Sequence, residues 1–309
     1  MSSPRVVVIG DLMTDVVTRV DDPLALGSDT PARVRTGQGG AGGNVAAWLA
    51  ALSVSTAFIG RVGDDPFGRE AVQVLGDAGV KVHVVVDAVV ATGACVILIG
   101  ADGERTMLPD AGANSALTVA QLPLAVIRDA GHLHVSGYTL LNPGSRAAGV
   151  AALAEAHAAG LATSVDAASA APLEAVGAAG FVELTAGVGL LFVTLDEAEV
   201  LCDSRNPGVV AARLTAHYPQ VVLKLGTAGA HWCPGEGRSA LSAPAVPTSG
   251  PVIDATGAGD AFAAAYLAVL AGGGEVSDAL AQGCRWGSAV VTREGTRPWP
   301  GAVSPGSRR

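Results

Sequence analysis

Short apolar runs alternate with amphipathic runs of helical length over most of the chain. The apolar runs of strand length lie at residues 5–9, 56–59, 132–136, 161–165, 190–194 and 221–225. The runs with helical spacing between them lie at 67–78, 118–129, 146–159, 172–178, 196–202 and 207–217. Strands that alternate with helices of this length predict an α/β fold, with a doubly wound, mainly parallel sheet covered on both faces.

Two segments interrupt this rhythm because they are β-like and poor in helical patterns. They cover residues 11–36 and 91–110, and the second contains Asp102-Gly103, a dipeptide typical of hairpin turns. We expect both to form one small sheet, a β lid that keeps water away from the main domain's site. The main domain is then built from residues 1–10, 37–90 and 111–300. Residues 301–309 are expected to be a disordered tail.

Composition and charge exclude several classes of protein. Half of the 309 residues are hydrophobic and 15% are charged, which predicts a folded chain with a sizeable core. The net charge of −9 argues against nucleic acid or an anionic membrane as a partner. No uninterrupted apolar stretch is long enough to cross a membrane, and no cationic leader precedes the first apolar run. Four widely spaced cysteines fit reduced thiols, so we expect a cytoplasmic protein.

The stretch with the most chemical content covers residues 252–260, where an apolar run, a glycine-bracketed turn and a helical run follow one another. The first amides of a helix lack intrahelical partners and suit an anion, and Gly257 and Gly259 let a phosphate approach the backbone. Asp260 would be a carboxylate held beside that anion. The alternative is an ordinary acid in a first helical turn. The two lysines of the chain lie outside any P-loop motif, so phosphates must rely on amides, metal and arginine.

A second glycine-rich stretch covers residues 37–43 and precedes Asn44. It formally matches the dinucleotide fingerprint, but the run before it is not a buried strand. A better interpretation is a loop whose amides face a small polar ligand, with Asn44 offering a donor and an acceptor. The alternative is a flexible turn with Asn44 as a helix cap. Asp15 follows the first strand, at the sheet edge where ligands bind, and its alternative is a solvated loop acid.

Two further stretches follow strand ends in the second half of the chain. Asp196 and Glu199 are three residues apart, so they share a helical face and could order metal-bound water near phosphates. Thr194 or Asp196 could instead simply cap the helix. Lys224 begins a strand-to-loop stretch that is rich in glycine up to Gly229.

These stretches together resemble the ribokinase (PfkB-type) family of carbohydrate kinases. Residues 39–46 and 60–68 resemble its N-terminal signature, and residues 254–262 resemble its C-terminal one. The intermediate landmarks also agree in order and spacing, so the resemblance covers about residues 5–300. It implies a ribokinase-like fold with a β lid and an ATP-dependent sugar kinase (ribokinase/fructokinase-like) that phosphorylates a hydroxyl group.

The resemblance also implies roles for individual residues. Asp260 would be the catalytic base, and the anion hole would consist of Gly257, Ala258 and Gly259. The sugar would be held by Asp15, Gly39, Gly40 and Asn44. Asp196 and Glu199 would organise Mg²⁺ and phosphates, Asp254 and Thr256 a monovalent cation, expected to be K⁺. The nucleotide would contact Gly226, Thr227 and Gly229.

Several alternatives remain open at this point. Residues 136–141 resemble nucleoside-kinase members of the family, so a nucleoside (adenosine-like) kinase is the close alternative. Ala41 stands where ribokinases carry a lysine, and Asp196 stands in place of the usual asparagine. An oxidoreductase would need a Rossmann turn at Gly37, and a sugar sensor would need no catalysis at all. Lids in this family can also pair, which implies a homodimer.

Overall fold

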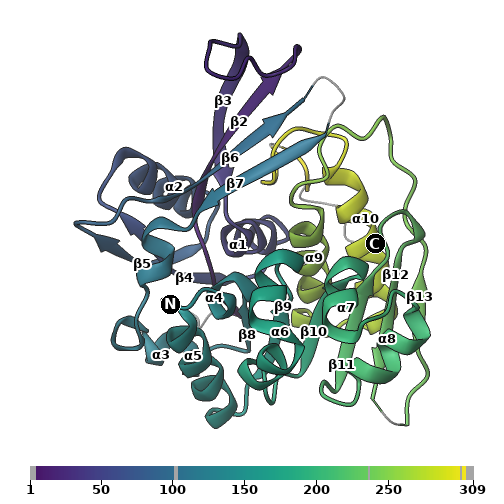
Figure 1. Ribbon diagram of the computed structural model, residues 1–309. Helices are drawn as coiled ribbons and strands as arrows, with labels where there is room; N and C mark the ends of the chain where they lie inside the picture. The colour runs from purple at the N-terminus through teal and green to yellow at the C-terminus, as the bar shows by residue number, and fades with distance from the viewer. Residues whose placement is uncertain (1–4, 101–103, 236, 300, 304–309) are drawn as a thin grey trace.

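The large sheet of the computed structural model runs through the middle of the main body (Figure 1). The structure describes residues 5–100, 104–235, 237–299 and 301–303. The strands of this sheet are β1 (Val6–Ile9), β4 (Thr56–Gly63), β5 (Lys81–Asp87), β8 (His132–Val135), β9 (Ala162–Asp166), β10 (Leu190–Thr194), β11 (Gln220–Lys224), β12 (Ala230–Pro234) and β13 (Leu241–Ala243). Their order is β13-β12-β11-β10-β9-β8-β1-β4-β5. All pairs from β5 to β11 are parallel, and β12 and β13 are antiparallel additions at one edge.

Helices cover both faces of this sheet. One face carries α1 (Ala41–Ala51), α2 (Pro66–Asp77), α9 (Ala258–Ala271) and α10 (Val276–Val290). The other carries α3 (Leu124–Arg128), α4 (Gly137–Leu141), α5 (Arg146–Ala158), α6 (Ala170–Leu184), α7 (Leu195–Cys202) and α8 (Pro207–Leu214). Strand β1 shows why both faces need a cover, because its side chains are apolar on both sides. Val6 and Val8 pack into the core under α1 and α9, and Val7 and Ile9 pack into the core on the opposite face. Burial of each such side chain stabilises the fold by roughly 1.5–3 kcal/mol. The arrangement confirms the predicted doubly wound, mainly parallel sheet covered on both faces.

A small sheet stands above the main body (Figure 1). Its strands are β2 (Met13–Val20), β3 (Ala32–Gly39), β6 (Gly93–Ile99) and β7 (Arg105–Asp110), in the order β3-β2-β6-β7. The sequence segments 11–36 and 91–110 therefore contribute to one sheet, although β3 continues to Gly39. The division into domains at those boundaries stays a prediction. Asp102-Gly103 and residues 304–309 of the expected tail lie outside the described residues.

Short helices and turns depart from the predicted pattern in two places. The run 118–129 is not one helix but a 3₁₀ turn, η2 (Val119–Gln121), followed by α3. Pro123 explains the break, because a residue before proline is disfavoured in the helical region, and Leu122 is extended with ψ 126°. Helix α6 is longer than the predicted 172–178 and contains a kink at Gly177, where φ is 76°.

Within the described ranges, no helix is long and apolar enough to cross a membrane.

Candidate active site

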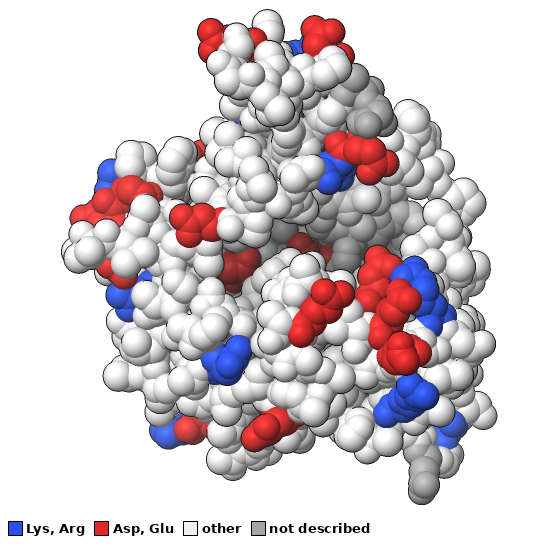
Figure 2. All heavy atoms as spheres, viewed as in Figure 1, with Lys and Arg blue, Asp and Glu red and all other residues white. Residues whose placement is uncertain are grey.

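A cavity of about 900 Å³ lies where the carboxyl ends of the central strands face the small sheet. Figure 2 shows it as a hollow below the small sheet, with acidic side chains inside. The ends of five strands supply Asp11, Tyr138, Asp166, Thr194 and Lys224 to its wall. The starts of α1 and α9 supply Asn44 and Asp260, and the small sheet supplies Met13, Asp15 and Met107. The two glycine-rich stretches of the sequence thus meet in one place.

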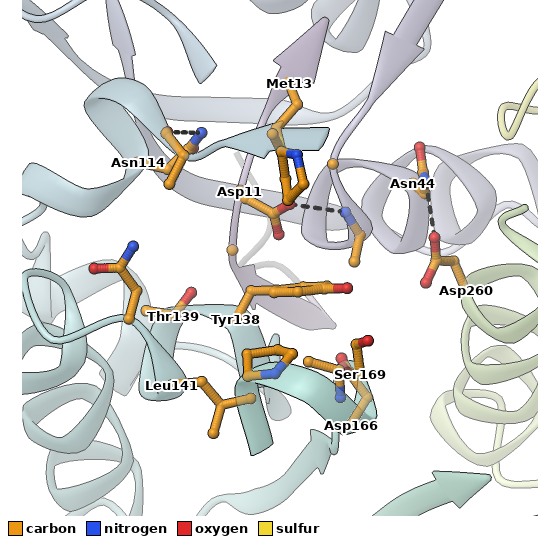
Figure 3. Close-up of a pocket in the computed structure, with 18 of the residues that line it drawn as sticks. Asp11, Met13, Asn44, Asn114, Tyr138, Thr139, Leu141, Asp166, Ser169 and Asp260 are labelled. Atoms are coloured by element: carbon orange, nitrogen blue, oxygen red, sulfur yellow. Dashed lines mark hydrogen bonds between the residues drawn. The ribbon is translucent and has the colours of Figure 1, made fainter. Parts of the chain in front are cut away.

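Asp260 lies in the first turn of α9 and is enclosed by the cavity wall. Its Oδ2 accepts a hydrogen bond of 2.7 Å from Asn44 Nδ2, drawn as a dashed line in Figure 3. The Oδ1 of Asn44 in turn accepts 2.9 Å from the Thr296 hydroxyl, which fixes the amide's orientation. Burial raises the pKa of Asp260 to about 7, although the bond from Asn44 opposes the rise. A carboxylate with such a pKa can accept a proton near neutral pH.

The amides at the start of α9 are free to bind an anion. Gly257 has φ 78°, and a Cβ atom there would lie 2.8 Å from Thr296 Cβ, so the tight turn requires glycine. No side chain caps this helix. Ala258 N donates a hydrogen bond of 3.3 Å to the Ala255 carbonyl, whereas the amides of Gly257, Gly259 and Asp260 have no acceptor among the described residues. A Cβ on Gly259 would lie 3.0 Å from Lys224 Nζ. The ammonium group of Lys224 therefore lies beside the start of α9, the end of a helix that favours an anion.

The four predicted sugar-binding residues lie close together, and one of them, Asn44, contacts Asp260 directly. A Cβ on Gly39 would lie 2.2 Å from Asp15 Oδ1, so the glycine makes room for this carboxylate. Gly40 has φ 89° and leads into α1, which carries Asn44. Burial raises the pKa of Asp15 to about 6, while the charge of Arg297 opposes the rise. The guanidinium of Arg297 is itself buried and donates to the carbonyl oxygens of Gly39 and Gly43.

Two buried acids of the cavity were not singled out by the sequence analysis. Asp11 accepts hydrogen bonds from the amides of Ala41 at 3.1 Å and Gly42 at 3.2 Å, and burial raises its pKa. Asp166 lies 3.3 Å from His134 Nε2. Burial alone would raise the pKa of Asp166. The hydrogen bond and the charge of His134 outweigh burial, so the pKa of Asp166 lies below its usual range. The signal available was position, since both acids lie at the carboxyl end of a buried strand: Asp166 ends β9, and Asp11 lies two residues after the end of β1.

The predicted magnesium residues lie on the outer side of α7. Asp196 and Glu199 share a face, as expected, but neither is among the described residues that line the cavity, and both accept hydrogen bonds from Arg205, at 2.6 and 2.8 Å. Their side chains are 72% and 54% exposed. Glu197 instead lines the cavity with Thr194, and the backbone amide of Thr194 donates 2.8 Å to Glu197 Oε2. The capping box Thr194-x-x-Glu197 therefore turns Glu197 inward.

The predicted nucleotide loop follows Lys224 as a 3₁₀ turn, η3 (Gly226–Ala228). Gly229 closes it with φ 95°, and its carbonyl accepts 2.8 Å from Leu225 N. None of Gly226, Thr227 and Gly229 is among the described residues that line the cavity. The loop lies next to the cavity in sequence, at the end of β11, and its contact with a nucleotide stays a prediction.

The predicted cation site is in contact with an arginine of the small sheet. Arg105 Nη1 donates 2.6 Å to Asp254 Oδ1 and 3.1 Å to Thr256 Oγ1, and its Nη2 donates 2.9 Å to the Ile253 carbonyl. Asp254 Oδ1 also accepts a hydrogen bond of 2.9 Å from Thr256 N, which shapes the turn before α9.

The oxidoreductase alternative, which needs a Rossmann turn at Gly37, is wrong, because Gly37 lies within β3 of the small sheet and follows no buried strand.

Comparison with known proteins agrees with this geometry. The model of the pfkB family of carbohydrate kinases matches residues 3–301. An ATP-dependent ribose-1-phosphate kinase from Halopiger xanaduensis is 32% identical over 302 residues, which cover 96% of this chain and 95% of that protein. The structure of Arabidopsis thaliana ribokinase complexed with ribose and ATP superposes with a TM-score of 0.82, at 23% identity and 97% coverage of both chains. Adenosine kinase from Sinorhizobium meliloti gives 0.83 at 23% identity, with 96% of both chains covered.

Proposed function

This chain belongs to the pfkB family of carbohydrate kinases, and from that premise we propose how its residues carry out phosphoryl transfer from ATP to a sugar hydroxyl. The fold is ribokinase-like, and the protein is an ATP-dependent sugar kinase. Asp260 is the proposed base. It is the acid of the cavity that lies within the same helical turn as the free amides of α9, and this observation carries the proposal.

A sugar hydroxyl becomes a good nucleophile only as its proton leaves. In the proposed reaction, the carboxylate of Asp260 takes that proton while the hydroxyl oxygen bonds to the γ-phosphorus and the bond to the β-phosphate oxygen breaks. Asn44 holds the carboxylate in place through its 2.7 Å bond. The amides of Gly257, Ala258 and Gly259 would stabilise the charge on the transferred group, and Lys224 would add a positive charge.

The nucleotide would approach from the side of Lys224. Thr194 and Glu197 lie there, and the loop with Gly226, Thr227 and Gly229 follows. Among the described residues, no group of three or more His, Cys, Asp and Glu side chains is arranged to hold a metal ion. A single buried carboxylate fits Mg²⁺, which keeps several waters and binds mainly through substrate phosphates. When bound, Mg²⁺ neutralises charge on those phosphates, and we propose Glu197 rather than Asp196 and Glu199 as the residue that orders its waters.

The acceptor would bind between Asp15 and Asp260. Carboxylate and amide oxygens are good hydrogen-bond acceptors for hydroxyl groups, and Asp11, Asp15 and Asn44 present several of them on one wall. Asn114 adds a fixed polar group, because its Oδ1 accepts 2.9 Å from Leu12 N and its Nδ2 donates 2.9 Å to the Leu12 carbonyl. A wall of this kind suits a small polyhydroxylated acceptor.

One observation favours the nucleoside alternative. The side chain of Tyr138 projects into the cavity beside Asp11 and Ser169 (Figure 3). An aromatic ring offers a stacking surface to a nucleobase, and apolar residues continue the wall beyond it. These residues are Leu141, Pro143, Pro172 and Val176. The cavity volume of about 900 Å³ leaves room for more than a pentose.

A phosphorylation screen distinguishes these acceptors. We would measure ADP release in the presence of ATP and Mg²⁺ with pentoses, hexoses, ribose 1-phosphate and nucleosides. Turnover with a free or phosphorylated sugar and none with adenosine supports the sugar kinase assignment. If nucleosides are preferred, Tyr138→Ala should raise the KM for the nucleoside by about tenfold while leaving that for ATP unchanged. ADP release that no acceptor stimulates would contradict the proposed acceptor site.

Potassium, the expected monovalent cation, does not fit the site as the structure has it. Asp254 and Thr256 would be its ligands, but the guanidinium of Arg105 lies on the same oxygen atoms. The proposed reaction therefore involves no potassium ion at this turn.

We propose a homodimer that forms through the small sheet. Val34, Val96 and Leu108 lie on its face away from the cavity and are 62%, 39% and 59% exposed. Paired sheets would cover this apolar face. The mass measured by light scattering after size-exclusion chromatography tests this, and Leu108→Lys should shift the mass to that of a monomer.

We also propose that the protein is cytoplasmic. All four cysteines lie within the described residues and are free thiols, which supports this proposal.

A further inference from the structure

The contact between Arg105 and the turn before α9 joins the small sheet to the phosphate-facing end of the main body. The two contact partners, Arg105 and Asp254, are 149 residues apart in the chain. Their side chains are 23% and 11% exposed, so water competes with this ion pair much less than with a surface pair. Three different oxygen atoms, a carboxylate, a hydroxyl and a carbonyl, accept from one guanidinium group.

Those three oxygens form the kind of donor set that a hard cation prefers. A guanidinium at 2.6–3.1 Å from all three fills the space that an ion bound to the same atoms would need. The two cations therefore exclude one another at this turn. Arginine also keeps its charge at any accessible pH, and its planar fork is suited to several acceptors at once.

The turn passes the effect of this charge on to the phosphate loop. Asp254 holds the amide of Thr256 at 2.9 Å, and Gly257 and the free amides of α9 follow immediately. Without a cation, the Asp254 carboxylate would be a buried, uncompensated negative charge beside a site for phosphates. Burying an unpaired charge is costly, and its field would also oppose the binding of ATP.

We propose that the guanidinium of Arg105 is the resident cation of this phosphate loop, in the place where a monovalent metal ion was expected. Arg105 is a positioning residue, because it acts on the loop through Asp254 and Thr256. Since it belongs to β7, the charge reaches the loop only when the small sheet is seated on the main body. The inference rests on the proposed phosphate loop at the start of α9.

The test compares Arg105→Ala with a matched control in KCl and in choline chloride of equal ionic strength. The control is Arg35→Gln, since Arg35 lies in the same small sheet and pairs with Glu294 at 3.4 Å, with side chains 40% and 50% exposed. We expect the wild type and the control to have equal kcat in both salts, within about twofold. Arg105→Ala should lose about 10–100-fold in kcat in choline chloride, by analogy with the loss of one electrostatic contact to a transition state.

Chemical rescue separates the charge from the packing. Guanidinium chloride at low millimolar concentration, or KCl, should restore kcat of Arg105→Ala at least fivefold, whereas the neutral isostere urea should not. A wild type that requires K⁺, a variant as active as the wild type in choline, or a loss that neither cation restores would each overturn the proposal.

Thermal unfolding provides a readout that does not depend on turnover. For Arg105→Ala, replacing choline with K⁺ should raise Tm by roughly 2–4 °C, because an ion that binds only the folded state stabilises it. The wild type and Arg35→Gln should show equal Tm in the two salts. If this cation response appears while Asp260→Asn keeps full activity, the role of Arg105 as the resident cation is supported and the role of Asp260 as the base is refuted. If the Tm of Arg105→Ala is the same in both salts, the inference itself fails.

Discussion

Asp260→Asn is predicted to lose most catalysis while the folded protein becomes more stable. The asparagine carbonyl can accept the same bond that Asn44 donates to Asp260, so the shape of the site and this contact are kept. What disappears is the basicity, and positioned proton transfer is typically worth about 10²–10⁴ in rate. We therefore expect kcat to fall by that factor, with the KM for ATP and the sugar changed by no more than about threefold.

The gain in stability follows from the pKa of Asp260. Burial raises it from 3.8 to about 7, so the folded state holds the proton more tightly than the unfolded state. Below the unfolded pKa both states are protonated and the charge costs nothing. Between about pH 4 and pH 7 the unfolded state alone loses its proton, and the free energy of unfolding falls. Above pH 7 the cost is constant, on the order of 4 kcal/mol, and Asp260→Asn removes it.

Two measurements on the same preparations test this reasoning. Thermal unfolding should give Asp260→Asn a higher Tm than the wild type at pH 8, and a similar Tm at pH 4. The pH profile of kcat/KM should rise with an apparent pKa near 7 in the wild type, and this acid limb should be absent from the residual activity of the variant. Near-normal kcat with a raised KM would make Asp260 a binding residue and refute the proposed mechanism.

Asp166→Asn is the contrasting variant, because its carboxylate lies in the same cavity but has the opposite shift. Burial raises the pKa of Asp166, yet His134 and Lys224 lower it overall, so folding favours its charged form. Its stabilising contribution is present above the unfolded pKa and is lost as pH falls. Asp166→Asn should therefore lower Tm at pH 8, where Asp260→Asn raises it. The same sign for both variants would mean that the charges in this cavity have been assigned wrongly.

Three further predictions concern single contacts of the site. Glu197→Gln should reduce kcat at limiting Mg²⁺ by about tenfold or more, whereas Glu199→Gln on the outer side of the same helix should stay within about twofold in the same assay. Gly39→Ala places a methyl group 2.2 Å from Asp15 Oδ1, so the sugar KM should rise at least tenfold in steady-state kinetics. Arg297→Met leaves the surrounding buried acids uncompensated, and chemical denaturation should show a loss of about 3–5 kcal/mol.

The overall fold and the centre of the site were predictable because both depend on local patterns. The strand and helix periods predicted a doubly wound sheet, and such a sheet has one edge at which its strand ends meet. Asn44 and Asp260 lie in the first turns of two helices near that edge, whereas Asp15 lies within β2 of the small sheet, and the structure brings all three into one cavity. Sequence order was enough here, since topology fixes which ends lie together.

The metal residues show where local reasoning stopped. Periodicity correctly placed Asp196 and Glu199 on one face of α7, but it could not say that Glu197 is the acid of this helix among the described residues that line the cavity. A rotation of about 100° per residue separates Glu197 from its neighbours. The signal that could have decided was the capping box from Thr194 to Glu197, because the side chain at its third position must fold back toward the start of the helix.

Arg105 shows the second limit, which is distance along the chain. Nothing near Arg105 in the sequence distinguishes it from any exposed arginine of a β-strand, and its partners follow about 150 residues later. The contact exists only because the small sheet sits over the start of α9. The same holds for Arg297, whose carbonyl acceptors belong to the stretch before and within α1. Long-range charge pairs of this kind require the tertiary structure.

The distribution of charge within the cavity gives the two substrates different places. Asp11 and Asp15 lie on the wall formed by the end of β1 and the small sheet, where hydroxyl groups can donate to carboxylates. Lys224 lies beside the start of α9, since a Cβ atom on Gly259 would lie 3.0 Å from Lys224 Nζ. This ammonium group and the helix amides would attract a triphosphate. Asp260 stands at the boundary between these regions. We therefore expect the sugar to bind beside Asp11 and Asp15 and the triphosphate beside Lys224, so that the hydroxyl and the γ-phosphate would meet beside the proposed base.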